Sequence, residues 1–483
     1  MKQVLLLLLG SFISISSTPG QSITWDDPKV VTTVSGVGSA RPKIGVVDGG
    51  RPIVMWGRQT NREVYFCRWE DTAFSTPLNI LPKGVTAFAT EWAGPSLASK
   101  GDTIFVAFKS QPEMDGFVYV VRSVDGGLNF SDTIRVSPHN RSRFPEVSVG
   151  PGGHPAVTYM NFDENWLEPA YVVRVSNDAG NSFANPRSAS GAAPGEVCDC
   201  CPGFILFDSD GLEVLFRNND SDIRDIWYSH SSDQGSSYDQ VTHIDPNNWK
   251  IGGCPSTGPE AVAFADSLYV TWRSNASGST KINLASVSRL DGGRGTYREF
   301  PNSTSLLQDY PKVAKGDDFL MVVYQESQGN TSTIQGVWGN PDDVFKGSIA
   351  PVTLSLEGSI RQQTPDVVID QHDIHLAWQD ASKNRVIYRH GVINLSTSND
   401  VHKPNTRVWP NPVTDLIHVA YHPDNTPKAV ELIELSTGRM VEVQPNLEDN
   451  AVVLDVNHQP EGVYLLRILG EYSVEYKRIA VVR

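Results

Sequence analysis

A repeated unit of 50 to 57 residues limits the folds that this chain of 483 residues can adopt. Each copy holds a proline, a short hydrophobic strand, a turn rich in Gly and Asp, and a second strand that ends in an aromatic and a polar residue. A unit this short cannot bury its hydrophobic face alone, so successive copies must pack against one another. The repeated prolines are Pro42, Pro95, Pro145, Pro202, Pro259, Pro311 and Pro365.

The length of the repeat indicates the architecture. A period near 50 residues with about four short strands per unit is typical of a β-propeller, in which each unit forms one blade. Seven copies therefore predict an all-β protein with a seven-bladed propeller over residues 21–395, and a six-bladed ring is the alternative. The seventh copy is short, so we expect the strand-like segment 29–34 to supply its outer strand and close the ring.

Three copies carry the further pattern S-x-D-x-G-x-x-(F/Y), which begins at Ser123, Ser176 and Ser231. Ser and Asp side chains bind nearby backbone N–H groups and glycine adopts positive φ, so the pattern predicts a tight turn. It resembles the Asp-box, or bacterial neuraminidase repeat (BNR), of sialidase-like propellers. The resemblance implies that these turns join the outer two strands of a blade, away from the active site.

The first 20 residues have the layout of a secretory signal peptide, with Lys2, an apolar run of about a dozen residues, and then small and polar residues. No later segment reaches 18 consecutive apolar residues, so we expect no membrane-spanning helix in the mature chain. The formal net charge is −15 and there is no basic tract, which argues against a nucleic-acid-binding protein. We therefore expect an exported protein.

A polar segment, 396–405, separates the repeats from residues 406–483, whose alternating strands predict a small antiparallel β-sandwich. This segment opens with Pro410-Asn411-Pro412 and Asp415, turns at Gly438, and reads G-V-Y-L-L-R from Gly462. These features resemble the C-terminal sorting domain of the type IX secretion system. The resemblance implies that residues 406–483 are recognised by that secretion machinery. It also implies passage across the outer membrane of a Gram-negative cell, followed by release or attachment at the surface.

In a propeller, the loops that lead into the first strands and those that leave the second strands meet at one face, near the axis. Several arginines fall there, and a guanidinium can bind a carboxylate or sulfate through two hydrogen bonds. We therefore expect a ligand site at this face. Its candidate residues are Arg41, Arg58, Trp92, Arg143, Arg217, Asn218, Arg273 and Arg361. The alternative is that these residues bind one another and the backbone around a water-filled channel.

The resemblance to sialidases implies catalytic roles for a few residues. Members of that family use three arginines for the substrate carboxylate, a tyrosine nucleophile backed by a glutamate, and an aspartate as acid and base. Arg41 would be the first arginine, with Arg217 and Arg273 completing the triad. Tyr310 falls where the nucleophile lies, with Glu260 or Glu326 as its partner. The loop after Trp56 holds no aspartate, so the acid and base has no match there.

Four of the five cysteines fall in the loops that lead into the fourth and fifth units. An exported chain can hold disulfides. Cys198 and Cys254 occupy nearly equivalent positions in these two units, so we expect one disulfide between them and a second, vicinal, disulfide between Cys200 and Cys201. The alternative is that the same four sulfurs bind copper or zinc. We expect Cys67 to be a buried free thiol.

Two classes of function are compatible with this sequence. The first is a non-catalytic binding or adhesion module that holds an extracellular glycan or glycoprotein at the axial face without a cofactor. The second is a glycan-active enzyme, an exo-sialidase, another glycoside hydrolase or a lyase, that works through Tyr310, the axial carboxylates and the arginines. A pair of axial carboxyl groups ~5–10 Å apart would favour the hydrolase.

Overall fold

The computed structural model describes residues 22–32, 39–238, 240–264, 266–301, 305–394, 406–421, 427–435, 439–441, 445–448, 451–469 and 474–483. The predicted signal peptide, residues 1–20, and the predicted linker, residues 396–405, lie outside these ranges. Within them, no helix has the length and apolar character that crossing a membrane requires.

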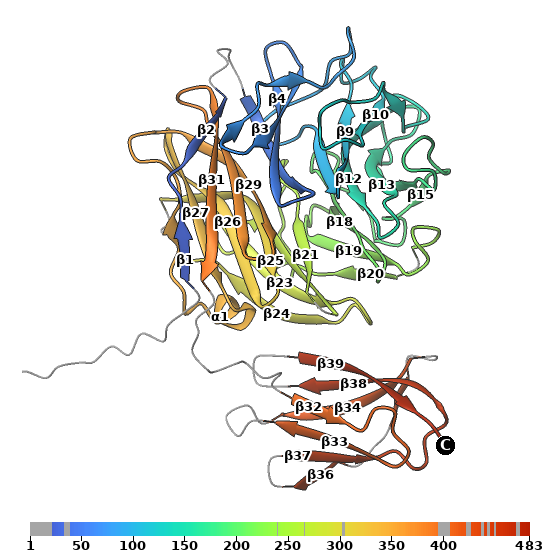
Figure 1. Ribbon diagram of the computed structural model, residues 1–483. Helices are drawn as coiled ribbons and strands as arrows, with labels where there is room; N and C mark the ends of the chain where they lie inside the picture. Colours follow the sequence, from blue (N-terminus) through green and yellow to red (C-terminus); the bar gives the residue numbers. More distant parts are fainter. Residues whose placement is uncertain are drawn as a thin grey trace, which may run out of the picture.

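Seven antiparallel sheets of the described residues form a ring (Figure 1). The innermost strand of each sheet contacts the innermost strands of the two neighbouring sheets, and these contacts run around the ring until they return to the start. Only a closed propeller gives this cycle of contacts. The predicted seven-bladed propeller is therefore confirmed, and the six-bladed alternative is wrong.

Each of the first six blades is built from consecutive strands of the chain. Blade 1 holds β3 (Ser39–Val47), β4 (Arg51–Arg58), β5 (Val64–Glu70), β6 (Ala73–Phe74) and β7 (Leu78–Asn79). Blade 2 holds β8 (Ser96–Lys100), β9 (Thr103–Lys109), β10 (Val118–Ser123) and β11 (Ile134–Arg135). Blade 3 holds β12 (Ser142–Val149), β13 (Pro155–Asn161), β14 (Ala170–Val175) and β15 (Arg187–Ser188). Blade 4 holds β16 (Glu196–Val197), β17 (Phe204–Phe207), β18 (Leu212–Asn219), β19 (Ile226–Ser231) and β20 (Gln240–His243); blade 5 holds β21 (Glu260–Phe264), β22 (Ser267–Ser274), β23 (Lys281–Ser288) and β24 (Arg294–Glu299). Blade 6 holds β25 (Leu307–Gly316), β26 (Phe319–Gln328), β27 (Thr331–Gly339) and β28 (Val352–Thr353), with the short helix α1 (Pro341–Lys346) before its last strand.

The seventh blade joins the two ends of the propeller. It holds β29 (Gln362–Asp370), β30 (Asp373–Asp380) and β31 (Arg385–Asn394), and two strands from the start of the chain, β1 (Ser22–Trp25) and β2 (Lys29–Thr32), pair with β31. The expected closure by segment 29–34 is confirmed over residues 29–32; residues 33 and 34 lie outside the described ranges. The pairing of β1 was not expected.

The core lies between blades and contains the repeated aromatic residue of every second strand. All seven of these side chains are buried: Trp56, Phe108, Tyr159, Phe216, Trp272, Tyr324 and Trp378. Large aromatic side chains bury more apolar area than any other residue type, so one such residue per repeat stabilises each contact between neighbouring sheets. The repeated aromatic is therefore a packing residue.

The three S-x-D-x-G turns have the geometry that the pattern predicts. The glycine N–H groups of Gly127, Gly180 and Gly235 donate to the serine hydroxyls at 2.9, 2.8 and 2.7 Å, and these glycines have φ of 85–86°. Hydrogen bonds from the backbone and side chain of Asn129 are the main cause that lowers the pKa of Asp125 to about 2. Each turn lies between the outer two strands of its blade, so these carboxylates stabilise turns.

Eight strands of the described C-terminal residues form a second body of two four-stranded antiparallel sheets. In order across the sheets these are β32 (Thr406–Trp409), β33 (Leu416–Tyr421), β37 (Ala451–Asp455) and β36 (Pro445–Glu448), then β35 (Arg439–Val441), β34 (Ala429–Glu434), β38 (Gly462–Leu469) and β39 (Val474–Val481). Buried side chains of both sheets, among them Val419, Leu454 and Leu466, form one core. This is the expected β-sandwich.

Candidate functional site at the axial mouth

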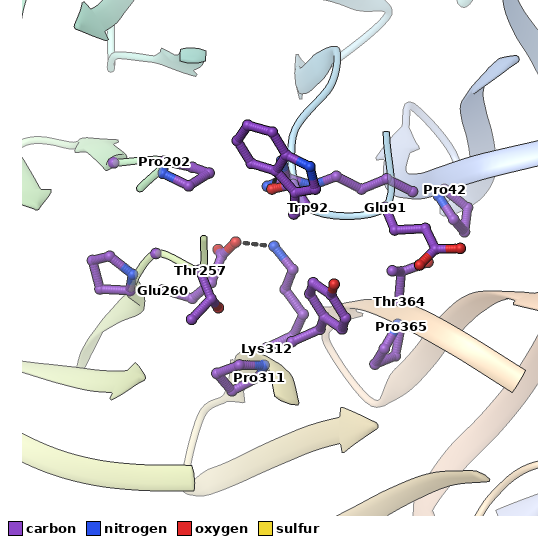
Figure 2. A pocket seen from close by; sticks show the side chains of 15 residues that line it. Pro42, Glu91, Trp92, Pro202, Thr257, Glu260, Pro311, Lys312, Thr364 and Pro365 are labelled. Carbon is purple, nitrogen blue, oxygen red and sulfur yellow. Dashed lines mark hydrogen bonds and ion pairs between the residues drawn. The ribbon is translucent and has the colours of Figure 1, made fainter. Parts of the chain in front are cut away.

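A pocket lies at the axis of the propeller, where the lead-in loops of several blades converge (Figure 2). Its empty volume is about 450 Å³, including the open mouth. Five of the repeated prolines line it, together with the side chains of Arg41, Glu91, Trp92, Thr257, Glu260, Tyr310, Lys312 and Thr364. The repeat of the sequence therefore places one short segment of each contributing blade at the same pocket.

A backbone irregularity precedes the repeated proline in four blades. Arg41, Phe144, Tyr310 and Thr364 have φ between 47° and 52°, and the pairing of the first two strands shifts register at each of these positions. Such bulges turn a side chain away from the regular alternation and are frequent beside binding sites. Three of the four residues, all but Phe144, line the axial pocket.

The residue that follows each repeated proline forms what we call the axial ring. Its members are Lys43, Ser96, Glu146, Gly203, Glu260, Lys312 and Asp366. Lys312 forms an ion pair with Glu260 and lies 3.7 Å from Asp366, and Figure 2 shows Lys312 directed at Glu260. The Glu146 carboxylate accepts hydrogen bonds from Ser96 at 2.5 Å and from Arg41 at 3.3 Å.

The charges of the axial ring depend on one another because its side chains are largely buried. Burial opposes ionisation of Glu146, but the charges of Lys43, Arg41 and Lys312 outweigh it and lower the pKa of Glu146. Burial, together with Lys43, lowers the pKa of Lys312 well below its ordinary value, although Asp366 opposes this shift. The charged members of the axial ring thus interact with one another, and two of them, Glu260 and Lys312, line the pocket.

Tyr310 lies in the axial pocket and is protonated at neutral pH. Burial is the main cause that raises its pKa, and the carboxylates of Asp309 and Glu91 raise it further. Glu260, one of its two expected partners, also lines the pocket, where it is paired with Lys312. Glu326, the other, lies outside the pocket lining and accepts a hydrogen bond from Gln308 at 3.3 Å.

The expected arginine triad does not converge on the pocket. Arg217 is fully buried and donates to the backbone oxygens of Arg224 at 2.7 Å and Arg273 at 2.9 Å. Arg273 binds Asp309 at 3.0 Å and the carbonyl of Pro255 at 3.1 Å. Only Arg41 of the triad lines the pocket. The physical reason is that turned loops leave backbone carbonyls unpaired, and an arginine with five N–H donors satisfies them.

Four further candidate ligand residues lie outside the pocket lining. Arg58 stacks over Tyr65, and Arg143 binds Glu113 at 3.0 Å. Asn218 is buried and donates to the carbonyl of Pro194. The exposed Arg361 precedes β29, where its backbone pairs with Ser332. These four residues contact other side chains and the backbone, as in the alternative given above.

The pocket also contains residues that were not predicted from the sequence. These are Thr257, Lys312 and Thr364. The sequence does carry a signal for Lys312, because the position after the repeated proline is polar or charged in six of the seven units. In a regular strand without the bulge, the side chain of Lys312 would point in another direction. The sequence pattern alone therefore does not predict that Lys312 lies in the pocket.

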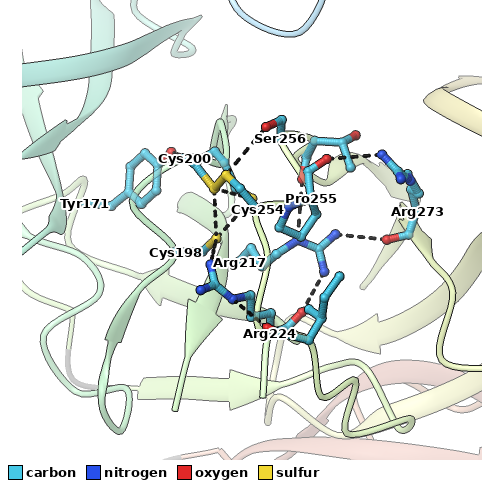
Figure 3. The surroundings of a disulfide bond; sticks show 12 residues. Tyr171, Cys198, Cys200, Arg217, Arg224, Cys254, Pro255, Ser256 and Arg273 are labelled. Atoms are coloured by element: carbon cyan, nitrogen blue, oxygen red, sulfur yellow. Dashed lines mark hydrogen bonds between the residues drawn. A yellow bond between two sulfur atoms is a disulfide. The ribbon is translucent and has the colours of Figure 1, made fainter. Parts of the chain in front are cut away.

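The cysteines pair differently from the prediction (Figure 3). All five are described, and Cys200 forms a disulfide with Cys254, whereas Cys67, Cys198 and Cys201 are buried free thiols. The expected bonds Cys198–Cys254 and Cys200–Cys201 are therefore wrong, and the expected free thiol at Cys67 is confirmed. The reason is a turn in which the Cys201 N–H donates to the Cys198 carbonyl at 3.1 Å.

This turn places the Cys198 and Cys201 sulfurs 3.2 Å apart and leaves Cys200 to face the next blade. The Cys201 thiol and the guanidiniums of Arg224 and Arg217 stabilise the Cys198 thiolate and lower the pKa of Cys198 to about 6 against the effect of burial. The sulfurs of Cys198, Cys200 and Cys201 lie within 4.8 Å of one another. Binding of copper or zinc at this cluster stays a prediction, and it requires the bond of Cys200 to Cys254 to be open.

Residues 407–482 match the family model of the secretion system C-terminal sorting domain. No curated protein matches the chain. Among solved structures, the chain is similar to the polysaccharide lyase Uly1, with 11% identity, 79% of this chain and 94% of that chain covered, and a TM-score of 0.46. It is also similar to an α-L-arabinanase of Penicillium chrysogenum, with 11% identity, 76% of this chain and 98% of that chain covered, and a TM-score of 0.41. A third similar structure is a sialidase of Trypanosoma rangeli, with 13% identity, 97% of this chain and 92% of that chain covered, and a TM-score of 0.43.

The match to the sorting domain has a direct consequence for the location of the protein. The chain carries the predicted C-terminal sorting domain of the type IX secretion system, so it is exported and then secreted or attached to the cell surface.

Proposed function

We propose that this exported propeller binds an extracellular glycan in its axial pocket, through the hydroxyl groups of the sugar. The observation that carries the proposal is the placement of the Trp92 ring beside the paired charges of Arg41, Glu260 and Lys312 in one pocket. Ligand pockets combine apolar or aromatic surface with a few placed polar groups, and a sugar presents both C–H faces and hydroxyls.

The charge balance of the pocket favours hydroxyl recognition over carboxylate recognition. Arg41, Lys43 and Lys312 face three carboxylates, those of Glu146, Glu260 and Asp366, and Glu91 also lines the pocket. A carboxylate ligand would have to displace these partners, whereas a hydroxyl group both donates and accepts hydrogen bonds and fits between a paired cation and anion. We therefore expect neutral oligosaccharides to bind more tightly than sialylated ones.

Glycan binding is tested with the mature protein on an array that carries neutral and sialylated oligosaccharides, followed by calorimetry on the best ligand. The variant Trp92→Ala is expected to weaken binding at least tenfold because it removes the aromatic wall. Trp227→Ala is the matched control, since that ring stacks on His243 in an outer strand. Equal affinity of both variants and the unaltered protein would place the ligand elsewhere.

A glycoside hydrolase is the second candidate function, because two carboxylates and a tyrosine line the same pocket. A retaining or inverting hydrolase needs one protonated and one ionised carboxyl group beside the scissile bond. Glu260 and Glu91 would take these roles, and Tyr310 would contact the sugar. Release of reducing sugar from the glycan selected above, and its loss in Glu260→Gln, would establish hydrolysis; intact glycan after prolonged incubation would leave binding as the function.

A further inference from the structure

Two buried thiols lie beside the single disulfide of the described residues. The Cys198 sulfur lies 3.5 Å from the Cys200 sulfur of the disulfide and 3.2 Å from the Cys201 sulfur. Cys198 and Cys201 have no exposed surface, Cys200 is partly buried, and Cys254 is exposed. The cluster therefore consists of an inner pair of thiols and an outer, solvent-accessible disulfide in contact with it.

The surroundings of Cys198 favour its thiolate form. Arg224 donates to the Cys198 sulfur at 3.0 Å, and Figure 3 shows this guanidinium beside the sulfur, with Arg217 close to it. Thiolates, and not thiols, attack disulfides, and a neighbouring guanidinium stabilises a thiolate. Cys198 is therefore the thiol that both lies beside the disulfide and has a guanidinium partner.

We propose that the four cysteines form a dithiol–disulfide relay between an inner pair, Cys198 and Cys201, and an outer pair, Cys200 and Cys254. In the first step the Cys198 thiolate attacks the Cys200 sulfur. The Cys198–Cys200 bond forms, the Cys200–Cys254 bond breaks, and Cys254 leaves as a thiolate that takes a proton from water. In the second step Cys201 attacks Cys198 and gives its proton to the departing Cys200 sulfur, which forms Cys198–Cys201 and releases Cys200 as a thiol.

The relay is balanced without an outside reactant, because one disulfide and two thiols are present before and after it. Its outcome is a buried disulfide and two accessible thiols on neighbouring loops. Gly252 and Gly253 precede Cys254 and have no atoms around the position of an added Cβ, so the loop has room to move once the bond opens. The outer pair is thus able to exchange with a dithiol or disulfide of another exported protein, while the inner pair stores the bond.

The test is maleimide labelling of the native protein without reductant, with acid quenching and peptide mapping under non-reducing conditions. We expect two labels, on Cys200 and Cys254, to appear together with a Cys198–Cys201 disulfide. The labelling rate should level off at high maleimide concentration, because it is then set by the internal exchange. Cys198→Ser should slow labelling of Cys254 at least tenfold, since the attacking sulfur is gone.

The variant Cys201→Ser tests the second step separately from Cys198→Ser. It should stop the relay after the first step, with one label on Cys254 and a Cys198–Cys200 disulfide. Cys67→Ser, which changes a buried thiol in blade 1, is the matched control and should label like the unaltered protein. The relay is overturned if the Cys198→Ser protein is labelled at the same rate as the unaltered protein. It is also overturned if the four cysteines form two disulfides, so that none of them can be labelled, or if their sulfurs hold a stoichiometric metal ion.

Discussion

Single residues decide the chemistry of the axial pocket, and Lys312 lies within ion-pair distance of two carboxylates. It is the cation that faces both Glu260 and Asp366, and its side chain is 10% exposed. Removing one member of a buried ion pair leaves the other charge without compensation, which costs more than the pair itself contributes.

Lys312→Met is therefore expected to lower the free energy of unfolding by about 2–3 kcal/mol. Urea unfolding of the two proteins measures this difference. The matched control is Lys281→Met, because Lys281 pairs with Glu299 at 3.0 Å in a more exposed position and such pairs are worth about 1 kcal/mol or less. Equal losses in both variants would show that the axial ring is not a coupled set of charges.

His375 is a second residue whose burial has a measurable effect. Its ring stacks on Tyr388, and burial lowers its pKa to about 4. Between pH 6.5 and pH 4 the unfolded chain takes up a proton at His375 that the folded chain does not, so the free energy of unfolding falls as the pH falls through this window. The loss at pH 4 is at most about 3 kcal/mol.

Urea unfolding at pH 7 and pH 4.5 tests this effect. His375→Gln should have a weaker pH dependence than the unaltered protein, and the exposed His372→Gln should keep the full dependence. An unchanged pH dependence in His375→Gln would assign the acid sensitivity to other groups.

Among the elements, β31 has the largest structural role because it joins the two ends of the propeller. It pairs with β1 and β2, and His390 on β31 binds Asp26 at 3.0 Å and Asp373 at 2.7 Å. Gly391 lies under the Trp25 ring, and a Cβ atom at Gly391 would come within 2.6 Å of that ring. The close approach of β1 to β31 thus depends on this glycine.

Gly391→Ala is expected to displace Trp25 and to lower the free energy of unfolding by about 1–3 kcal/mol, the usual cost of overpacking. Thermal unfolding followed by circular dichroism measures it, and a loss of Trp25 burial should appear in the fluorescence. Gly252→Ala is the control, because nothing lies within 4 Å of its added Cβ. A Gly391→Ala protein as stable as the control would mean that β1 is not needed for closure.

At the scale of the whole molecule, the fold could be predicted and the site only in part. Seven copies of one pattern give the blade count, and the short last copy indicates where the chain must close. The axial face was also predicted, with Arg41, Trp92, Glu260 and Tyr310 in its pocket. The remaining contacts depend on loop conformation, which the repeat does not specify. A bulge reorients the residues beside the repeated proline in four of the blades, and one turn decides that Cys200 and not Cys198 faces Cys254.

The sorting domain leads to a prediction about the whole chain. A protein that ends at residue 405 should fold its propeller but stay in the periplasm of a cell with a type IX system, because the segment that the machinery recognises is missing. Immunoblots of periplasm, cell surface and medium measure the distribution, with the full chain as control. Appearance of the shortened protein at the surface would contradict the role of residues 407–482.

We expect the pairing of the first and last strands of the propeller to decide when an exported chain becomes resistant to proteases. Asn394 on β31 bonds to Ser22 across 372 residues of sequence, so the seventh blade is incomplete until nearly the whole propeller has crossed the inner membrane. Contacts between such distant residues form late in folding, after loops have closed. A chain stalled during translocation therefore presents an open ring with an uncovered edge strand, and proteases can remove it before the sorting domain reaches the outer membrane.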